Sequence, residues 1–360
     1  MTAIAPPLPR PMAPGSPLRR RMRRFSAVSG MTLLAIAIVS AFLMPLAYMV
    51  STAFKEKSQL TAPGAPWYPA SPETFVYQGQ EVPVYDVPID GGLRALALID
   101  AGREESTFVD PTDATATPIV WQGRWRTLHQ HWRFEPYTQN VQTAWEVIEF
   151  PRLLMNTLVI AGVGTLGAVV SSVCVAYGFS RFRFPGRNGL FLVLLSTIIL
   201  PFQVTLIPTF AVFSWLGWVG TWLPLIVPHF FANAYNVFLL RQYFLTIPRE
   251  LDEAAMIDGA GALRILWSVV IPQARAAIVA VSLFHFFWAW NEFFLPLIYL
   301  QGHDNLAPLS VGIYRFNGTY SQEPTLIQAA AIMAMAIPVV VFFLAQRAFM
   351  RGVVFSGVEK

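Results

Sequence analysis

The chain alternates between long apolar segments and short charged ones over most of its length. An apolar run at 27–53 is long enough to cross a bilayer, which takes about 20 residues in an α-helix. Five comparable segments follow, at 153–179, 188–213, 222–244, 266–300 and 326–345. The pattern predicts an all-α polytopic membrane protein with six transmembrane helices, five of them in a core at 151–347.

Prolines recur in the later apolar segments, where each removes a backbone donor and kinks a helix. They are Pro201, Pro208, Pro224, Pro228, Pro272, Pro296 and Pro338. Within a membrane such kinks are tolerated where protein or water satisfies the freed carbonyl groups. The prolines therefore indicate either helices that line a solute pathway or kinks that serve packing alone.

The first 26 residues form a tail rich in proline and arginine. This composition cannot bury a core, so we expect a disordered tail held on the cytoplasmic side by its charge. A secretory signal is the alternative interpretation of 27–53, with 51–53 resembling a cleavage site. The apolar run exceeds the roughly 7–15 residues of a signal sequence, and we expect an uncleaved first helix.

One extended polar region, 54–150, separates the first two apolar segments. Its middle part, 77–132, carries short alternating strand-like runs, and the steps Gln78-Gly79 and Gln122-Gly123 predict hairpin turns. We expect a small β-rich module inserted in an extracytoplasmic loop. The module either contacts a binding protein or shields the membrane core.

Composition and charge agree with a membrane protein and set its orientation. Hydrophobic residues make up 55% of the 360 residues and charged residues only 13%. The net charge of +4 arises from basic residues between apolar segments, which indicates topology rather than nucleic-acid binding. These basic residues follow the second, fourth and sixth segments: Arg181, Arg183 and Arg187; Arg241, Arg249 and Arg264; Arg347, Arg351 and Lys360. Both termini, including a tail at 348–360, are therefore predicted to be cytoplasmic.

A charged segment between the fourth and fifth apolar segments, 246–265, predicts two short helices joined by a tight turn; we call it the elbow. Pro248 and the acids Glu250, Asp252 and Glu253 suit the first turn of a helix. Gly259 can adopt the left-handed conformation that ends a helix.

The elbow resembles the EAA loop of permease subunits of binding-protein-dependent ABC importers. The shared order is Glu253-Ala254-Ala255, three residues, Gly259, nine residues, Val269, one residue, Ile271-Pro272, with Val269 and Ile271 where the family usually has Ile and Leu. The resemblance implies that the elbow docks on a cytoplasmic ATPase subunit, with Glu253 paired to a basic residue and Asp258 bracing the turn. The coupling residues it assigns are Glu253, Ala254, Ala255, Asp258, Gly259 and Pro272.

The same resemblance implies the type I ABC importer permease fold in a bacterial or archaeal inner membrane. It also implies four kinds of partner: a second homologous permease subunit, two ATPase subunits, an extracytoplasmic solute-binding protein and the lipid membrane. No cofactor is expected on this chain, because ATP and magnesium would bind the ATPase. Transport would proceed by alternating access, and the chain itself would not be an enzyme.

The absence of an energy source within the chain agrees with that interpretation. The only lysines are Lys55, Lys57 and Lys360, and none follows a glycine-rich turn, so no P-loop is present. Ionisable residues within the apolar segments are few, and His229 and His285 look isolated. A secondary carrier remains an alternative. A membrane-embedded receptor or enzyme using 54–150 is another, with His129, His131 and the acids near Glu104 as metal candidates.

An aromatic cluster in the fifth apolar segment is the candidate solute contact. Residues 290–297 resemble the fifth span of sugar-importer permeases, particularly the second permease subunit of the maltose importer. Possible pathway residues are Trp288, Trp290, Asn291 and Glu292, because aromatic faces stack on sugars while polar groups bind hydroxyls. The substrate expected is a sugar, oligosaccharide or related polyol. An aromatic belt at the membrane interface is the alternative interpretation.

The last outward loop, 301–325, is a candidate for docking a solute-binding protein. Its glycines and polar residues suit a protruding loop, and the candidate contacts are Gly312, Tyr314 and Asn317. An ordinary polar loop explains the same composition equally well.

Overall fold

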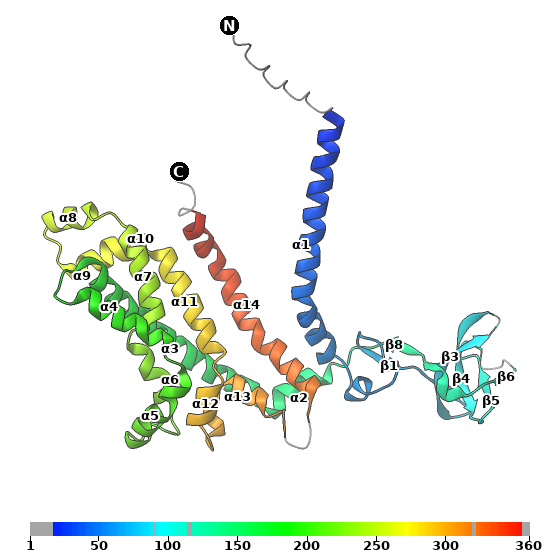
Figure 1. Cartoon of the computed structure of the whole chain (residues 1–360). Coiled ribbons are helices and arrows are strands. Elements are labelled where there is room, and N and C mark those ends of the chain that lie inside the picture. Colours follow the sequence, from blue (N-terminus) through cyan, green and yellow to red (C-terminus); the bar gives the residue numbers. More distant parts are fainter. Residues whose placement is uncertain (1–16, 90, 114–116, 319–321, 355–360) are drawn as a thin grey trace, which may run out of the picture.

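A computed structural model of the chain describes residues 17–354 except 90, 114–116 and 319–321. Residues 1–16 of the predicted N-terminal tail and 355–360 of the C-terminal tail therefore lie outside the described residues. The described chain consists of a helical bundle, two long helices beside it and a β-sheet region at the far end (Figure 1).

The apolar segments form eight of the α-helices. These are α1 (Pro17–Ala53), α3 (Phe150–Arg181), α4 (Arg187–Ser196), α5 (Phe202–Trp215), α6 (Leu223–Ile226), α7 (Ala234–Thr246), α11 (Arg275–Trp290) and α14 (Pro324–Val354). Both terminal helices reach into segments that we predicted as tails, because α1 begins at Pro17 rather than 27 and α14 continues to Val354. Arginine and the apolar residues found there have good helix propensity, so each helix runs past its apolar part.

Four helical stretches are long and apolar enough to cross a membrane: Val28–Ala53, Phe150–Arg181, Leu223–Thr246 and Pro324–Gln346. Two more candidates are bent pairs, Arg187–Ile199 with Phe202–Trp215 at 98° and Ala262–Gln273 with Arg275–Trp290 at 82°. The described residues thus contain four candidate spans, or six if each bent pair crosses as one.

The two bends lie in the segments 188–213 and 266–300, where the prolines predicted kinked helices, and each bend divides its segment into separate helices. At the first bend Leu200 is extended, as expected for a residue that precedes a proline, here Pro201. The second bend falls at Ala274, between α10 and α11, and the helix before it contains a π-helical turn, Leu266–Val270, just ahead of Pro272. Proline has no N–H to continue the regular ladder, which accounts for the altered turn.

Short helices connect the spanning elements. They are α2 (Gln139–Val147), α8 (Glu250–Ile257), α9 (Ala262–Ile265), α10 (Ile271–Gln273), α12 (Phe294–Tyr299) and α13 (Leu309–Tyr314). The helices α8 and α9, the N-terminal end of α1 and the C-terminal end of α14 all lie at one end of the molecule (Figure 1).

The β-sheet region contains eight strands: β1 (Ala70–Pro72), β2 (Thr74–Tyr77), β3 (Gln80–Ile89), β4 (Gly92–Asp100), β5 (Glu105–Val109), β6 (Ile119–Gln122), β7 (His129–Gln130) and β8 (Trp132–Phe134). Strands β2 to β6 follow one another in an antiparallel sheet, β7 pairs with β3, and β1 pairs with β8. Because β1 and β8 are the first and last strands, their pairing brings together the two ends of the β-sheet region, which lead to α1 and α2.

One of the two predicted hairpin turns is confirmed and the other is wrong. Gln78 and Gly79 both have positive φ, 49° and 82°, and join β2 to β3 in the two-residue turn that suits a hairpin. Gly123 instead follows the last residue of β6, and its amide donates to the Glu104 carbonyl at 2.6 Å. The chain then leaves the sheet rather than reversing.

Two large hydrophobic cores, and a smaller one around Leu225 and Tyr299, hold the bundle together. The first joins α2, one half of α3, the end of α11, α13 and α14, and it includes Leu153 and Trp290. The second joins the other half of α3 to α7, α9 and α11, and it includes Tyr177 and Phe244. Helix α3 therefore takes part in both cores and is the central element of the bundle.

Candidate functional site

Within the elbow, Gly259 ends helix α8, as we predicted. Gly259 has φ +79°, and its amide donates to the Met256 carbonyl at 3.0 Å. The amide of Ala260 donates to the Ala255 carbonyl at 2.9 Å, which completes a Schellman motif at the end of α8. The conformation predicted from the glycine alone is therefore confirmed, and α9 begins three residues later.

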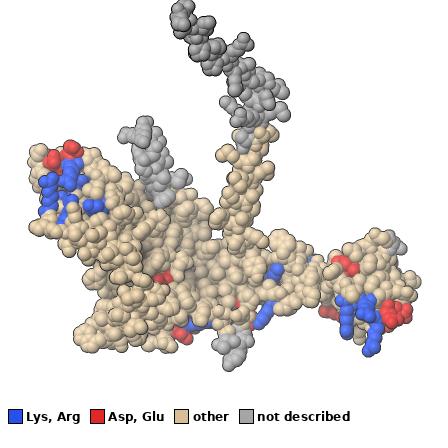
Figure 2. Space-filling model, viewed as in Figure 1, with Lys and Arg blue, Asp and Glu red and all other residues tan. Residues whose placement is uncertain are grey.

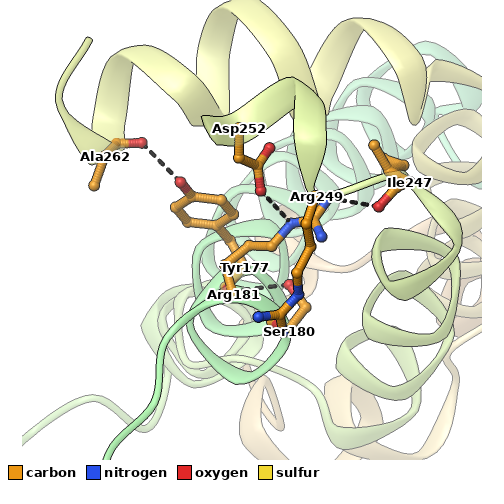
Figure 3. A network of polar contacts seen from close by, with 7 residues as sticks. All are labelled: Tyr177, Ser180, Arg181, Ile247, Arg249, Asp252 and Ala262. Atoms are coloured by element: carbon orange, nitrogen blue, oxygen red, sulfur yellow. Dashed lines mark hydrogen bonds and ion pairs between the residues drawn. The ribbon is translucent and has the colours of Figure 1, made fainter. Parts of the chain in front are cut away.

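A buried ion pair fastens the elbow to α3 (Figure 3). Nε of Arg181 lies 2.9 Å from Oδ2 of Asp252, and the two side chains are only 6% and 8% exposed. Arg181 stands in the last turn of α3 and Asp252 in the first turn of α8. The negative end of one helix dipole and the positive end of the other favour these charges.

Three further hydrogen bonds join the same turn of α3 to the elbow (Figure 3). Arg181 donates through Nη2 to the Ile247 carbonyl at 3.1 Å, and Arg249 donates to the Ser180 carbonyl at 3.4 Å. The Tyr177 hydroxyl donates to the Ala262 carbonyl at 3.0 Å. The loop before α8, α8 itself and the start of α9 are thereby all attached to one helix end.

The sequence places Asp252 in a favourable helix turn but does not by itself pair it with Arg181. Tyr177 and Arg181 are four residues apart and therefore lie on one face of the last turns of α3. Polar side chains at that spacing indicate a partner on a neighbouring element, although the spacing does not identify it.

The outer face of the elbow remains exposed within this chain. Glu253 and Ala254 are exposed, and so is Ile257, at 88%. Figure 2 shows acidic side chains at the tip of this end with a group of basic side chains beside them. Met256 and Leu263 of the elbow are exposed as well, and large exposed apolar patches rimmed by polar residues mark sites of protein–protein interaction.

The remaining predicted coupling residues occupy different environments. Ala255 is half-buried and packs against the second hydrophobic core, while Asp258 is exposed directly after the last residue of α8, at its C-cap. Pro272 is half-buried within α10, directly after the π-helical turn. These positions suit roles in the shape of the elbow, with Glu253 and Ala254 left to face a partner.

A cavity of about 600 Å³ lies on the side of the bundle away from the elbow, among α3, α5, α7, α11 and α12. Polar groups that line it are Thr157, Thr197, Thr205, Thr209, His229, Asn233, Trp288, Glu292 and Tyr299. Hydroxyl, amide, imidazole and carboxylate groups among apolar side chains supply the hydrogen-bond donors and acceptors that suit a polyhydroxylated solute.

The structure divides the four predicted pathway residues. Trp288 is half exposed and lines the cavity, and so does Glu292, whose Oε1 also accepts the amides of Phe294 and Leu295 at 3.0 and 3.2 Å. Trp290 does not line the cavity, which corrects its prediction as a pathway residue: it is 6% exposed and packs in the first hydrophobic core.

Asn291 lies outside the cavity, and its role in the pathway stays a prediction. It is exposed, and its Nδ2 donates to the Phe287 carbonyl of its own helix at 2.7 Å. Trp288 and Trp290 are two residues apart and point in roughly opposite directions on an α-helix, so only one of them reaches the cavity.

Two histidines that look isolated in the sequence are hydrogen-bonded beside this cavity. Nε2 of His285 lies 3.1 Å from Nδ1 of His229, and Nδ1 of His285 lies 3.2 Å from Nδ2 of Asn236. The His229 ring also contacts Trp288, with ring centroids 5.7 Å apart. The chain of polar groups fixes His229 at the cavity wall, which corrects the expectation that the histidines are isolated.

The predicted docking residues are also divided. Gly312 is buried in α13, and a Cβ added to it would lie 2.0 Å from Cδ1 of Leu153. It therefore serves close packing against α3, which corrects its assignment as a surface contact. Tyr314 and Asn317 are exposed and line a shallow depression of about 300 Å³.

The metal candidates of the β-sheet region do not assemble into a metal site. Nδ1 of His131 lies 2.7 Å from Oδ1 of Asp86, and its Nε2 lies 3.6 Å from Oε2 of Glu73. Among the described residues, no group of three or more His, Cys, Asp or Glu side chains is arranged to hold a metal ion.

A second polar cluster of the β-sheet region surrounds Asp110, at the end of β5. The hydroxyl and amide of Thr112 donate to Asp110, and Arg94 pairs with it at 2.8 Å. These contacts, led by the Thr112 hydroxyl, hold the pKa of Asp110 below its usual range.

Comparison with known proteins places the bundle in a family context. Residues 159–354 match the family described as "Binding-protein-dependent transport system inner membrane component". The chain is 34% identical to the osmoprotective compounds uptake permease protein GgtD of Synechocystis sp., over 57% of this chain and 69% of that protein. It is 35% identical to the sn-glycerol-3-phosphate transport system permease protein UgpE of Yersinia pestis, over 61% and 80%.

The fold resembles that of a solved transporter. A chain in the crystal structure of a bacterial ABC transporter that imports the acidic polysaccharide alginate superposes with a TM-score of 0.62 at 20% identity. The superposition covers 91% of this chain and 98% of that one, so the likeness extends beyond the matched family region.

Proposed function

Because the chain belongs to the family of binding-protein-dependent transport system inner membrane components, we propose that it is one of two permease subunits of an ATP-driven ABC importer. The observation that carries this proposal is the elbow, an exposed apolar and acidic surface held rigidly on the end of α3. A transporter subunit without a P-loop needs a motor, and this surface is where a motor can dock.

The ATPase would bind the exposed face of α8, with Glu253 paired to one of its basic residues. ATP and magnesium would be held by two ATPase subunits, and this chain would hold neither. A second homologous permease subunit would complete the pathway, and an extracytoplasmic solute-binding protein would deliver the solute. Tyr314 and Asn317 are exposed contacts available to that binding protein.

The orientation proposed follows from the ends of the helices. The elbow, the start of α1 and the end of α14 share one end of the molecule, and an ATPase is cytoplasmic (Figure 1). Both termini would then be cytoplasmic in the inner membrane, and the chain would cross six times, each bent pair counting once. The β-sheet region would be an extracytoplasmic insertion.

The substrate proposed is a sugar, oligosaccharide or related polyol. Its pathway would include the cavity, where Trp288 can stack on a C–H face and Glu292 can accept hydroxyl hydrogen bonds. UgpE, a relative at 35% identity, is named as a permease of an sn-glycerol-3-phosphate transport system, and a polyol phosphate is close to this class of solute. A second permease subunit would supply the other half of the pathway.

The test is a pull-down of the tagged chain from native membranes in mild detergent. Wild type should recover an ATPase and a second permease subunit, and Glu253→Arg should recover less of the ATPase. Glu250→Arg is the matched control, because it makes the same change at another exposed position of α8. A wild-type chain that is recovered alone would refute the proposal and favour a secondary carrier.

A further inference from the structure

We infer that the Arg181–Asp252 ion pair is the joint through which movement of the elbow is passed to α3. Both residues would then be positioning residues for transport, without touching ATPase or solute. The inference rests on the proposed function. It adds the route by which a movement of the elbow on the ATPase would reach the cavity.

The joint resists opening because of where it is buried. Both side chains are more than nine-tenths buried, and neither Oδ1 of Asp252 nor Nε of Arg181 has a hydrogen-bond partner among the described residues, so the 2.9 Å contact is held by charge. Separating the two groups while the site stays closed to water would leave each as an uncompensated buried charge, which is far less favourable than keeping them paired. When the elbow moves, the end of α3 is therefore expected to move with it.

The joint also has more than one point of attachment (Figure 3). Arg181 holds both Asp252 and the Ile247 carbonyl, so a single side chain grips α8 and the loop before it. Tyr177 holds the start of α9 through the Ala262 carbonyl. Attachment at several points prevents the elbow from swivelling about one contact.

Helix α3 leads directly from this joint to the cavity. It is continuous over 32 residues, and Thr157 and Ile160 near its other end line the cavity. The covalent route from α9 to α11 instead passes through the π-helical turn and the 82° bend. A continuous helix moves as one unit along its length, whereas a route through a π-helical turn and an 82° bend joins helices with different axes.

The test measures a movement at the cavity that depends on nucleotide. Thr205→Cys, exposed on the cavity wall, is introduced with Cys174→Ser, since Cys174 is the only cysteine. Labelling by a water-soluble maleimide is followed in membranes with and without ATP and vanadate. The assembled wild-type transporter should change its labelling rate by about tenfold, the effect of a tenfold shift in population.

Asp252→Asn should abolish that change while the pull-down still recovers the ATPase. Arg181→Gln with Asp252→Asn should do the same, and it leaves no unpaired buried charge, which protects the test if the single variant folds poorly. Glu250→Gln is the control: it removes a charge from the same helix turn, is exposed, and should respond as wild type does.

A wild-type response in the double variant would overturn the inference. Loss of the ATPase from both Asp252 variants would overturn it as well, because the pair would then shape the docking surface rather than transmit movement. Failure of wild type itself to recover an ATPase would refute the proposed function and the inference together, and the pull-down distinguishes that result from the others.

Discussion

Substitution of Gly259 tests the turn on which the elbow depends. An added Cβ would meet no atom within 4 Å, so Gly259→Ala has no steric clash and its cost is that of the left-handed backbone alone. That cost is about 1–2 kcal/mol for an L-residue at φ +79°. Gly259→Pro also removes the amide bonded to Met256, worth about 1 kcal/mol more, and its φ cannot be positive.

Hydrogen exchange of the Ala260 amide, which closes the Schellman motif, reports this cost directly. Gly259→Ala should accelerate that exchange by about five- to thirtyfold, because each 1.4 kcal/mol is a factor of ten. Gly261→Ala is the matched control, since Gly261 has an ordinary φ of −74° and an equally open Cβ position. Gly259→Pro should abolish uptake while membrane insertion persists.

Equal exchange rates in Gly259→Ala and Gly261→Ala would contradict the assigned strain. Normal uptake by Gly259→Pro would contradict the coupling role of the elbow. The two results separate the local geometry, which the structure fixes, from the function that we propose for it.

Three further predictions concern other parts of the chain. Trp288→Ala should lower uptake without changing the melting temperature of the purified chain, whereas Trp290→Ala should lower its free energy of unfolding by about 3–5 kcal/mol, because only the second ring is buried in a core. Gly312→Ala should destabilise the bundle by about 1–3 kcal/mol through overpacking, while Gly162→Ala, with open space at its Cβ, should not; equal melting temperatures would contradict the packing assigned to α13. The lowered pKa of Asp110 contributes stability that is present above the usual carboxyl pKa of about 4 and lost as pH falls through the lower folded value. Acid melts of the β-sheet region should therefore show a smaller pH dependence in Asp110→Asn.

The features determined by the sequence alone are local ones. Apolar runs indicate the spanning segments, because a helix in lipid satisfies its own backbone and needs only apolar side chains. Gly259 predicts the end of α8, since few other residues adopt positive φ without strain. The order of residues around Glu253 indicates the family, which the comparisons confirm.

The sequence predicts roughly where the two bends lie but not how large they are. Pro201 and Pro272 mark where the ladder of hydrogen bonds must break. The bend angles of 98° and 82° depend on what packs on either side, and no local pattern contains that information.

The tertiary structure alone decided which residues meet. It paired Arg181 with Asp252, joined His229 to His285, and turned Trp288 toward the cavity while burying Trp290. Helical periodicity separates the two tryptophans onto opposite faces but does not say which face is the core. That choice, like the burial of a charge pair, follows from the packing of segments far apart in the chain, where close contact and the exclusion of water fix the partners.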